Sequence, residues 1–341
     1  MAGRVTAHKP AAVAAATAAA ATAAAPARPP RTRKQHRHKT DQSVEKQWQR
    51  LPDRSLLQFE RKGWVLTQGL LPQQQLQQVK GCIEQVVQQR KLEALRHRVR
   101  VLCSDCQDQL GSIRSEAQAL ALIQQHGSSE LGFLQFFNLH RSEGLIAELV
   151  RSKQLAATAA QLLAAKKLRL YQDCVFLKEP GYAETNWHSD LRMAPLDAND
   201  FVTAWIPLRP VGGAEGDSGL LFAEGSHRDF ALPFWHDLKG RDLGDRSYPL
   251  QDAGPMQVGD VSWHHGWTLH CAPPQPPDTP QRLALAVSYF ADGARLLARK
   301  RDKSVHRHML HDEDAESYGG WLAGMKDGAV VRHEQLPLVY P

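Results

Sequence analysis

The sequence predicts a mainly β fold with added helices, a double-stranded β-helix (jelly-roll) barrel covered by N-terminal helices. Before residue 166, apolar residues recur at helical spacing, and from Leu168 onward they alternate with polar ones, which is the period of a strand. The strand-like runs are short and closely spaced, with Gly and Pro between them, as in barrels and sandwiches. We therefore expect a β core at about 166–292.

The front of the folded part is expected to be helical. A short strand is expected at 63–66, and Pro72 then stands where Pro is favoured, in the first turn of a helix. Apolar residues follow at helical spacing up to about Arg90. Further helices are expected at 115–125, 144–153 and 154–165, the last with Ser152 as its cap.

The β core is expected to contain strands at 168–178, 201–208, 220–223, 260–263, 268–271 and 282–290. A Gly-rich loop at 212–219 and a Pro-rich connection at 273–280 separate some of them. Residues 230–257 are an irregular insertion with Trp235 and Tyr248. With the front helices, it is expected to cover the substrate, because long loops in compact domains are usually functional.

Charge is unevenly distributed along the 341 residues. The net charge is +6, but residues 1–40 contain eight basic residues and no acidic one, which leaves 34 basic and 36 acidic residues in the body. A nucleic-acid footprint on the body is therefore not expected. No run is long and apolar enough to predict a membrane span. We expect a leader at 1–50 and one domain at 51–341; the sequence does not indicate an oligomeric state.

The leader has the composition of an organelle transit peptide. An Ala/Thr tract runs from Ala11 to Ala25, and a basic run extends from Arg31 to Lys39. Transit peptides are basic and poor in acidic residues. A chloroplast is the first expectation and a mitochondrion the second; a cytoplasmic protein with an untargeted tail, or with a nucleic-acid-binding arm, is the alternative.

Five cysteines form no disulfide framework for a chain of this size, and their odd number fits a reducing compartment. Cys103-x-x-Cys106 has no second Cys pair and no His pair at zinc-finger spacing. The expectation for these two residues is ordinary thiols, with a redox or zinc role as the alternative.

The segment from Trp187 to Asp190 contains the motif H-x-D. In an extended strand, residues two apart point to the same face, so His188 and Asp190 can reach one ion. An imidazole and a carboxylate are two-thirds of the 2-His-1-carboxylate triad that holds iron(II) and leaves open positions. Alone, the motif also describes a polar surface loop.

Five histidines further along the chain are candidates for the third ligand: His227, His236, His264, His265 and His270. His270 is favoured, because it ends one expected strand and Arg282 opens the next. If those strands pair, the two side chains lie close together, and a guanidinium can grip the carboxylate of a co-substrate. His264 and His265 remain the alternatives, whereas His227 and His236 are expected to be structural.

Together these features resemble the phytanoyl-CoA dioxygenase (PhyH) family of iron(II)/2-oxoglutarate oxygenases over about 59–290. The resemblance rests on these segments in this order: Gly63-Trp64, H-x-D at 188–190, Ser218 to Leu221, Glu224 to His227, Gly259 to Val261, Leu269-His270 and Arg282. It implies a cupin-like jelly roll, iron(II) held by His188, Asp190 and His270, and 2-oxoglutarate bound by Arg282. It further implies that Trp205 and Cys174 line the co-substrate pocket, where Gln172 is on the same strand face as Cys174.

The implied activity is hydroxylation of a small, apolar organic substrate, with O2 consumed, succinate and CO2 released, and ascorbate as an accessory reductant. Asp190 distinguishes the chain from related halogenases, which lack this carboxylate. One departure from the family pattern is Cys271-Ala272, where many members have Gly-Ser and a hydroxyl that contacts 2-oxoglutarate. Residues that would mark a CoA ester substrate are not recognisable.

Two other functions remain open at this point. Cys271-Ala272 is compatible with a non-catalytic barrel that binds a ligand. A barrel with zinc or another divalent ion, as in cupin-type isomerases, would need no arginine behind the metal, so Arg282 argues against it.

Overall fold

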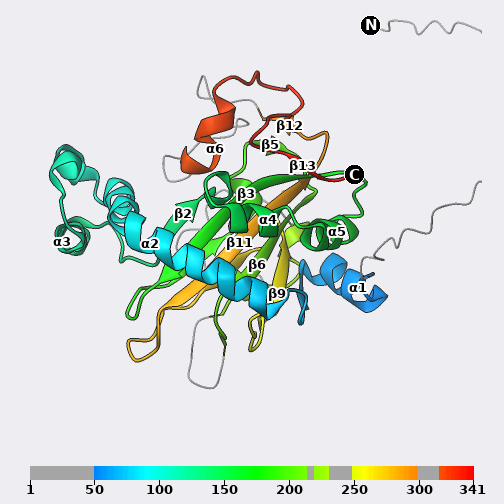
Figure 1. Ribbon diagram of the computed structural model, residues 1–341, viewed down its shortest axis with the longest axis horizontal. Coiled ribbons are helices and arrows are strands. Elements are labelled where there is room, and N and C mark those ends of the chain that lie inside the picture. Colours follow the sequence, from blue (N-terminus) through cyan, green and yellow to red (C-terminus); the bar gives the residue numbers. More distant parts are fainter. Residues whose placement is uncertain (1–49, 213–218, 230–247, 298–314) are drawn as a thin grey trace, which may run out of the picture. The chain divides into compact units, whose positions relative to one another are not determined.

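Except for α6, the α-helices that the structure describes lie in the first half of the chain, and most of the strands follow. The computed structural model describes residues 50–212, 219–229, 248–297 and 315–341 (Figure 1). The predicted transit peptide, Trp235, His236 and most of the 230–257 insertion lie outside these ranges. The α-helices are α1 (Asp53–Lys62), α2 (Gln73–Leu102), α3 (Glu116–His126), α4 (Gly144–Val150), α5 (Lys153–Leu162) and α6 (Ala315–Leu322). None of those described is long and apolar enough to cross a bilayer.

Helix α2 is longer than predicted, because it continues to Leu102 rather than ending near Arg90. It begins directly after Pro72, and its first half buries Leu76 and Ile83. The second half keeps an apolar stripe through Leu95 and Val99, both fully buried. Figure 1 shows α2 running across the strands of the larger sheet, which it covers.

Capping residues explain where two of the helices start. Ser115 accepts a hydrogen bond from the backbone N–H of Gln118 and forms a capping box with it at the start of α3. Ser152 caps α5 as predicted, accepting from the N–H of Leu155. Helix α1 was not predicted; it starts after Pro52 and ends at Gly63, whose φ of 81° is left-handed.

Two antiparallel sheets form the β core, which confirms the predicted fold class. The larger sheet has seven strands, in the order β1 (Trp64–Thr67), β9 (Val261–His265), β6 (Phe201–Pro207), β11 (Arg282–Ala291), β3 (Leu168–Lys178) and β13 (Leu338–Tyr340), with β2 (Leu134–Phe137) also paired to β3. The smaller has four, in the order β4 (Thr185–His188), β10 (His270–Ala272), β7 (Leu221–Ala223) and β8 (Leu250–Asp252). A separate pair joins β5 (Leu196–Asp197) and β12 (Arg295–Leu296).

The central strand β11 has both faces buried, and each face has a different role. Leu283, Leu285 and Val287 belong to the apolar cluster that includes the helices. Ala284 and Ala286 alternate with them and face the smaller sheet. Successive side chains of a strand point to opposite faces, so the small alanines leave space between the sheets.

The predicted pairing of the strands at His270 and Arg282 is wrong. β10 pairs with β4 and β7 of the smaller sheet, whereas β11 pairs with β3 and β6 of the larger one. The Pro-rich connection 273–280 therefore carries the chain from one sheet to the other instead of closing a hairpin. His270 and Arg282 both reach the space between the sheets, but not as neighbours in one ladder.

Gly63 supports the site through Thr268, whose hydroxyl donates to the Gly63 carbonyl at 2.8 Å. A Cβ at Gly63 would lie 2.3 Å from the Thr268 hydroxyl and 2.5 Å from His227, whereas one at Gly69, also left-handed, meets nothing within 4 Å.

We expect Gly69→Ala to reduce the free energy of unfolding by about 1 kcal/mol from backbone strain. Gly63→Ala adds a steric clash of roughly 1–3 kcal/mol. Denaturant titration of both variants measures this difference, and equal losses would contradict the proposed contact.

Candidate metal centre

Three side chains, two from strands of the smaller sheet and one from the turn after β4, come together between the two sheets. His188 ends β4, His270 begins β10, and the two are register partners. Asp190 follows the extended Ser189 and starts a 3-10 turn at Asp190–Arg192. One potential ligand atom from each of the three lies within 4.8 Å of the other two. The Asp190 Oδ1 is 3.8 Å from His188 Nε2 and 3.6 Å from His270 Nε2.

Backbone carbonyls orient both imidazoles. The Nδ1 of His188 lies 2.7 Å from the carbonyl oxygen of Asn186, and that of His270 lies 3.0 Å from the carbonyl oxygen of Thr268. A carbonyl only accepts, so Nδ1 carries the proton in both rings. The lone pair of each Nε2 is then free to face Asp190, as in histidines that bind metals.

Asp190 is held from behind by the larger sheet. Its Oδ2 accepts hydrogen bonds from the Thr203 hydroxyl at 2.5 Å and from His264 Nε2 at 3.0 Å. Thr203 in turn lies 3.0 Å from the hydroxyl of Ser288. Burial alone would raise the pKa of Asp190, but the nearby His270, His264 and His188 keep it below its usual value. Burial, with His188 and His264 nearby, lowers the pKa of His270. The site therefore combines a carboxylate with a neutral imidazole at neutral pH.

The alternative third ligands occupy other places. His264 touches Asp190 through the oxygen that faces away from His188 and His270, so it supports the carboxylate. His265 lies instead beside Phe59 and His227, and burial lowers its pKa to about 3. His227 Nε2 is 3.0 Å from the Glu60 carbonyl oxygen, a structural contact.

A cavity of about 410 Å³ opens beside the three side chains. All seven residues predicted for the site line it: His188, Asp190, His270, Arg282, Trp205, Gln172 and Cys174. They come from both sheets, because β3, β6 and β11 supply one wall and β4 and β10 another. Alternation along β3 places Gln172 and Cys174 on the inner face together.

Arg282 is nearly fully buried, with 2% of its surface exposed. Its guanidinium carbon lies 5.5 Å from the centre of the Trp205 ring, within cation–π range. Lys178 is its register partner on β3 and is also buried. The Lys178 ammonium donates to the carbonyls of Ala183 at 2.5 Å and Pro273 at 2.9 Å. Burial, and then the charge of Arg282, lowers the pKa of Lys178 to about 7.

Cys271 and Ala272, the departure from the family pattern, also line the cavity. Burial, and then the charge of Glu184, raises the pKa of Cys271 to about 12. The side chain is therefore a neutral thiol at physiological pH. A thiol is only a weak hydrogen-bond donor, so it does not replace the hydroxyl that many family members carry.

The front of the chain contributes to the cavity, but Tyr248 does not. Arg98 of α2 and Phe133, which follows α3, are among the lining residues. The Tyr248 hydroxyl instead donates to Asp229 at 2.6 Å, and its ring packs near Ala223 and Leu269. The part of the insertion that the structure describes is not wholly irregular as predicted, because its residues Leu250–Asp252 form strand β8 of the smaller sheet.

Sequence reasoning did not identify Thr203, Ser288 and Lys178 as supporting residues, and it considered His264 only as a possible metal ligand. Thr203 and His264 bind Asp190, Ser288 contacts Thr203, and Lys178 lies beside Arg282. Thr203 and Ser288 are polar residues at positions where β6 and β11 otherwise carry apolar ones, and this interruption of the pattern is the signal that could have indicated them.

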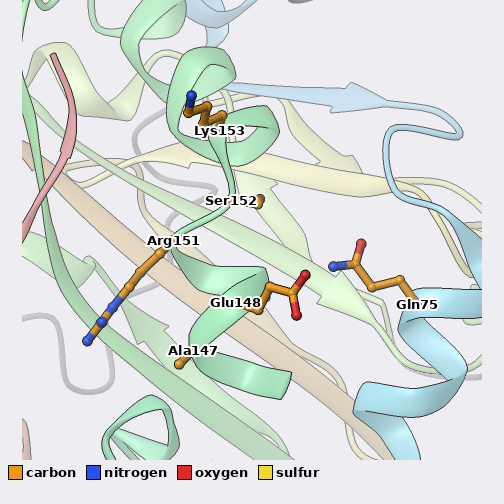
Figure 2. Close-up of a pocket in the computed structure, with 6 residues that line it drawn as sticks. All are labelled: Gln75, Ala147, Glu148, Arg151, Ser152 and Lys153. Atoms are coloured by element: carbon orange, nitrogen blue, oxygen red, sulfur yellow. The ribbon is translucent and has the colours of Figure 1, made fainter. Parts of the chain in front are cut away.

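A second hollow, of about 500 Å³, lies away from the predicted site residues (Figure 2). It is lined by Gln75 at the start of α2 and by Ala147 to Lys153 around the turn between α4 and α5. Figure 2 shows the Arg151 side chain extending away from Glu148 and Gln75, so the polar groups do not converge on one point.

The pKa of Lys178 gives a pH dependence that can be measured. Because the folded pKa is about 7 and the usual value is 10.5, the unfolded chain binds more protons between these pH values. Stability gained from this group therefore rises with pH through that window, with a slope of up to about 1.4 kcal/mol per pH unit. Relative to Lys178→Met, the wild type should gain stability from pH 7 to pH 10 in denaturant titrations. The exposed Lys166→Met is the control, and a constant difference between wild type and Lys178→Met would contradict the assignment.

Solved structures of similar fold include three proteins described with alpha-ketoglutarate (2-oxoglutarate). The carbocyclase SnoK from nogalamycin biosynthesis, described as non-heme and alpha-ketoglutarate (2-oxoglutarate) dependent, is similar over 84% of this chain and 96% of its own, with a TM-score of 0.61 and 22% identity. The epimerase SnoN, in complex with Fe3+, alpha-ketoglutarate and nogalamycin RO, covers 84% of this chain and 98% of its own at a TM-score of 0.55 and 20% identity. EctD from S. alaskensis, solved with 2-oxoglutarate and 5-hydroxyectoine, is similar over 72% of this chain and 78% of its own. Its TM-score is 0.51 and its sequence identity is 16%.

A search among curated proteins found no match. The family model for phytanoyl-CoA dioxygenase (PhyH), however, matches residues 59–276, which is more than half of the chain and includes β4, Asp190 and β10. The chain belongs to the phytanoyl-CoA dioxygenase (PhyH) family.

Proposed function

We propose that this protein is an iron(II)- and 2-oxoglutarate-dependent dioxygenase that hydroxylates a small organic substrate. The observation that carries the proposal is the convergence of His188, Asp190 and His270 in the cavity that Arg282 also lines. Membership of the PhyH family and the similarity to SnoN, which was solved with Fe3+ and alpha-ketoglutarate, support it.

The donor set suits iron(II). Two imidazole nitrogens and one carboxylate oxygen are the 2-His-1-carboxylate triad of non-heme iron oxygenases, which leaves positions open for other ligands. His188 and His270 would offer Nε2, since each Nδ1 already donates to a carbonyl. Asp190 would offer Oδ1, since Oδ2 is engaged by Thr203 and His264. These supporting contacts fix the ligands before a metal arrives.

The other end of the cavity suits a dicarboxylate. Arg282 is a buried cation, and its planar guanidinium can pair with a carboxylate through two hydrogen bonds. Trp205 packs against the guanidinium and limits its orientations. Lys178 adds little competing charge, because its pKa is close to neutrality. Arg282 would therefore hold the distal carboxylate of 2-oxoglutarate, while Gln172 and Cys174 line the same wall.

With O2, iron and 2-oxoglutarate supply the oxidising chemistry, and succinate and CO2 are the co-products. The protein's own part is to bind, orient and exclude water. His188, Asp190 and His270 set the geometry, and the buried β11 face keeps bulk water away from Arg282. Asp190 fills the position that would have to be vacant for a halide, so hydroxylation is favoured over halogenation. SnoK and SnoN, titled carbocyclase and epimerase, demonstrate that this fold also supports other outcomes.

The walls of the cavity restrict the substrate class. Phe133, Phe137 and Phe176 contribute aromatic surface, which favours an apolar or ring-containing substrate. Arg98 lies on the same wall, with its guanidinium 4.9 Å from the centre of the Phe133 ring. We therefore propose a substrate with an apolar body and at least one polar group.

Oxygen-dependent conversion of 2-oxoglutarate to succinate tests this function. Anaerobically prepared protein reconstituted with Fe2+ should form succinate, and His270→Ala or Asp190→Ala should lower the rate at least about 100-fold, since each removes a metal ligand. His333→Gln, a histidine outside the cavity, serves as the control. No succinate from iron-loaded wild type, across a panel of apolar and ring-containing substrates, would favour the ligand-binding barrel. Preferential retention of zinc at His188, Asp190 and His270 would favour the isomerase-type alternative.

Substitution of Arg282 tests co-substrate binding independently of metal binding. Arg282→Lys keeps the charge but loses the two-pronged geometry, so the KM for 2-oxoglutarate should rise roughly 10–100-fold, the equivalent of about 1.5–3 kcal/mol for charged hydrogen bonds. Fe2+ affinity, measured by anaerobic titration without 2-oxoglutarate, should stay within about twofold, because the metal ligands are unchanged. An unaltered KM would argue against Arg282 as the carboxylate partner.

A further inference from the structure

The Cys103-x-x-Cys106 motif has a partner that its spacing in the sequence does not reveal. Cys103 is the C-cap of α2, and Cys106 lies in the 3-10 segment Ser104–Ser112 that follows. His126, the last residue of α3, is brought beside this segment, where the N–H of Ser128 donates to the Leu102 carbonyl at 2.8 Å. Two thiols, a carboxylate and an imidazole thus gather at one place.

The contacts in this cluster have the spacing of metal ligands. The ligand atoms of Asp105, Cys106 and His126 all lie within 4.8 Å of one another. Asp105 Oδ1 lies 3.7 Å from the Cys106 sulfur, and Asp105 Oδ2 lies 3.0 Å from His126 Nδ1. A tetrahedron with bonds of about 2.0–2.3 Å has edges of roughly 3.3–3.8 Å, so little movement would be needed. The Cys103 thiol interacts with that of Cys106 but is not within 4.8 Å of all three ligand atoms, so it would have to turn from the Leu122 carbonyl to become the fourth ligand.

Burial and electrostatics at this place favour a cation. Both thiols are fully buried, whereas the Asp105 and His126 side chains are 62% and 37% exposed. The sulfurs therefore form the floor, and the other two ligands form a rim that solvent reaches. The C-terminal ends of α2 and α3 both lie here, and a helix C-terminus attracts positive charge. The same ends disfavour a free thiolate, so the two thiols would lose their protons only when a metal ion binds them.

The cluster lies next to the wall of the catalytic cavity. Arg98, which lines the cavity, is in α2 little more than one turn before Cys103. Ser129 and Glu130, which also line it, come shortly after His126. An ion held between the ends of α2 and α3 would join both cavity-lining segments. Its role would be to position the wall, with no part in oxidation.

We propose that Cys103, Asp105, Cys106 and His126 form a structural zinc site that ties the end of α2 to the end of α3. Cysteine, histidine and aspartate are all zinc ligands, and a closed set of four ligands is the geometry of structural zinc sites. Binding would release the two thiol protons, and the Cys103 thiol would give up its hydrogen bond to the Leu122 carbonyl. This inference does not depend on the proposed oxygenase activity.

Cobalt(II) is a suitable probe, because thiolate ligands give it a near-ultraviolet charge-transfer absorption that imidazole and carboxylate ligands do not. Full-length reduced protein, with His188→Ala and His270→Ala to remove the other candidate metal centre, should show this absorption saturating at about one equivalent. Stoichiometric Zn2+ should abolish it. Cys106→Ser should weaken binding at least 100-fold, and Cys82→Ser, which changes a thiol outside the cluster, should leave it unchanged.

Measurement of the unsubstituted chain guards against misfolding of the variants. Wild-type protein purified without chelator should contain close to one equivalent of zinc, and this zinc should remain after iron has been removed. Removing the zinc with a chelator should lower the melting temperature of the protein by a few degrees. Absence of the charge-transfer band in folded, reduced wild type would overturn the proposal. The proposal would also be overturned if folded Cys106→Ser protein bound cobalt as tightly as wild type does. A Cys103–Cys106 disulfide in anaerobically prepared protein would overturn it too.

Discussion

The Asp190 carboxylate connects the two sheets, and the rest of the site depends on it. It receives hydrogen bonds from Thr203 and His264 of the larger sheet, and it faces His188 and His270 of the smaller one. A buried carboxylate among imidazoles is costly unless positive charge compensates it, since desolvation of an ion costs several kcal/mol. A divalent cation coordinated by Asp190, His188 and His270 would supply that charge. The geometry is therefore explained more simply by metal binding than by structural stabilisation alone.

The fold creates this site by separating two kinds of strand face. On β11, large aliphatic residues face the helices, and small or polar ones face the cavity. The small side chains of Ala286 and Ser288 line the cavity and leave space between the sheets. Arg282 stands at the start of the same strand, so the rigid central strand of the larger sheet fixes the cation relative to the metal ligands. Sites on such strands are held more precisely than sites on loops.

Local patterns allowed much of this to be predicted, and long-range pairing accounts for what was missed. H-x-D, the alternation from Leu168 and the cap Ser152 depend only on neighbouring residues. The strand partners of His270 could not be predicted in that way, because the Pro-rich connection crosses between the sheets, whereas adjacent strands in a sequence usually pair. The link between Cys106 and His126 was missed for the same reason, because helix α3 separates them in sequence but the fold brings them together in space.

An anaerobic crystal structure of the protein soaked with Fe2+ and 2-oxoglutarate tests the central claim most directly. The account predicts iron bound to His188 Nε2, Asp190 Oδ1 and His270 Nε2, with the far carboxylate of 2-oxoglutarate paired to Arg282. Iron coordinated by His264 in place of one of these residues, or 2-oxoglutarate bound away from Arg282, would contradict it.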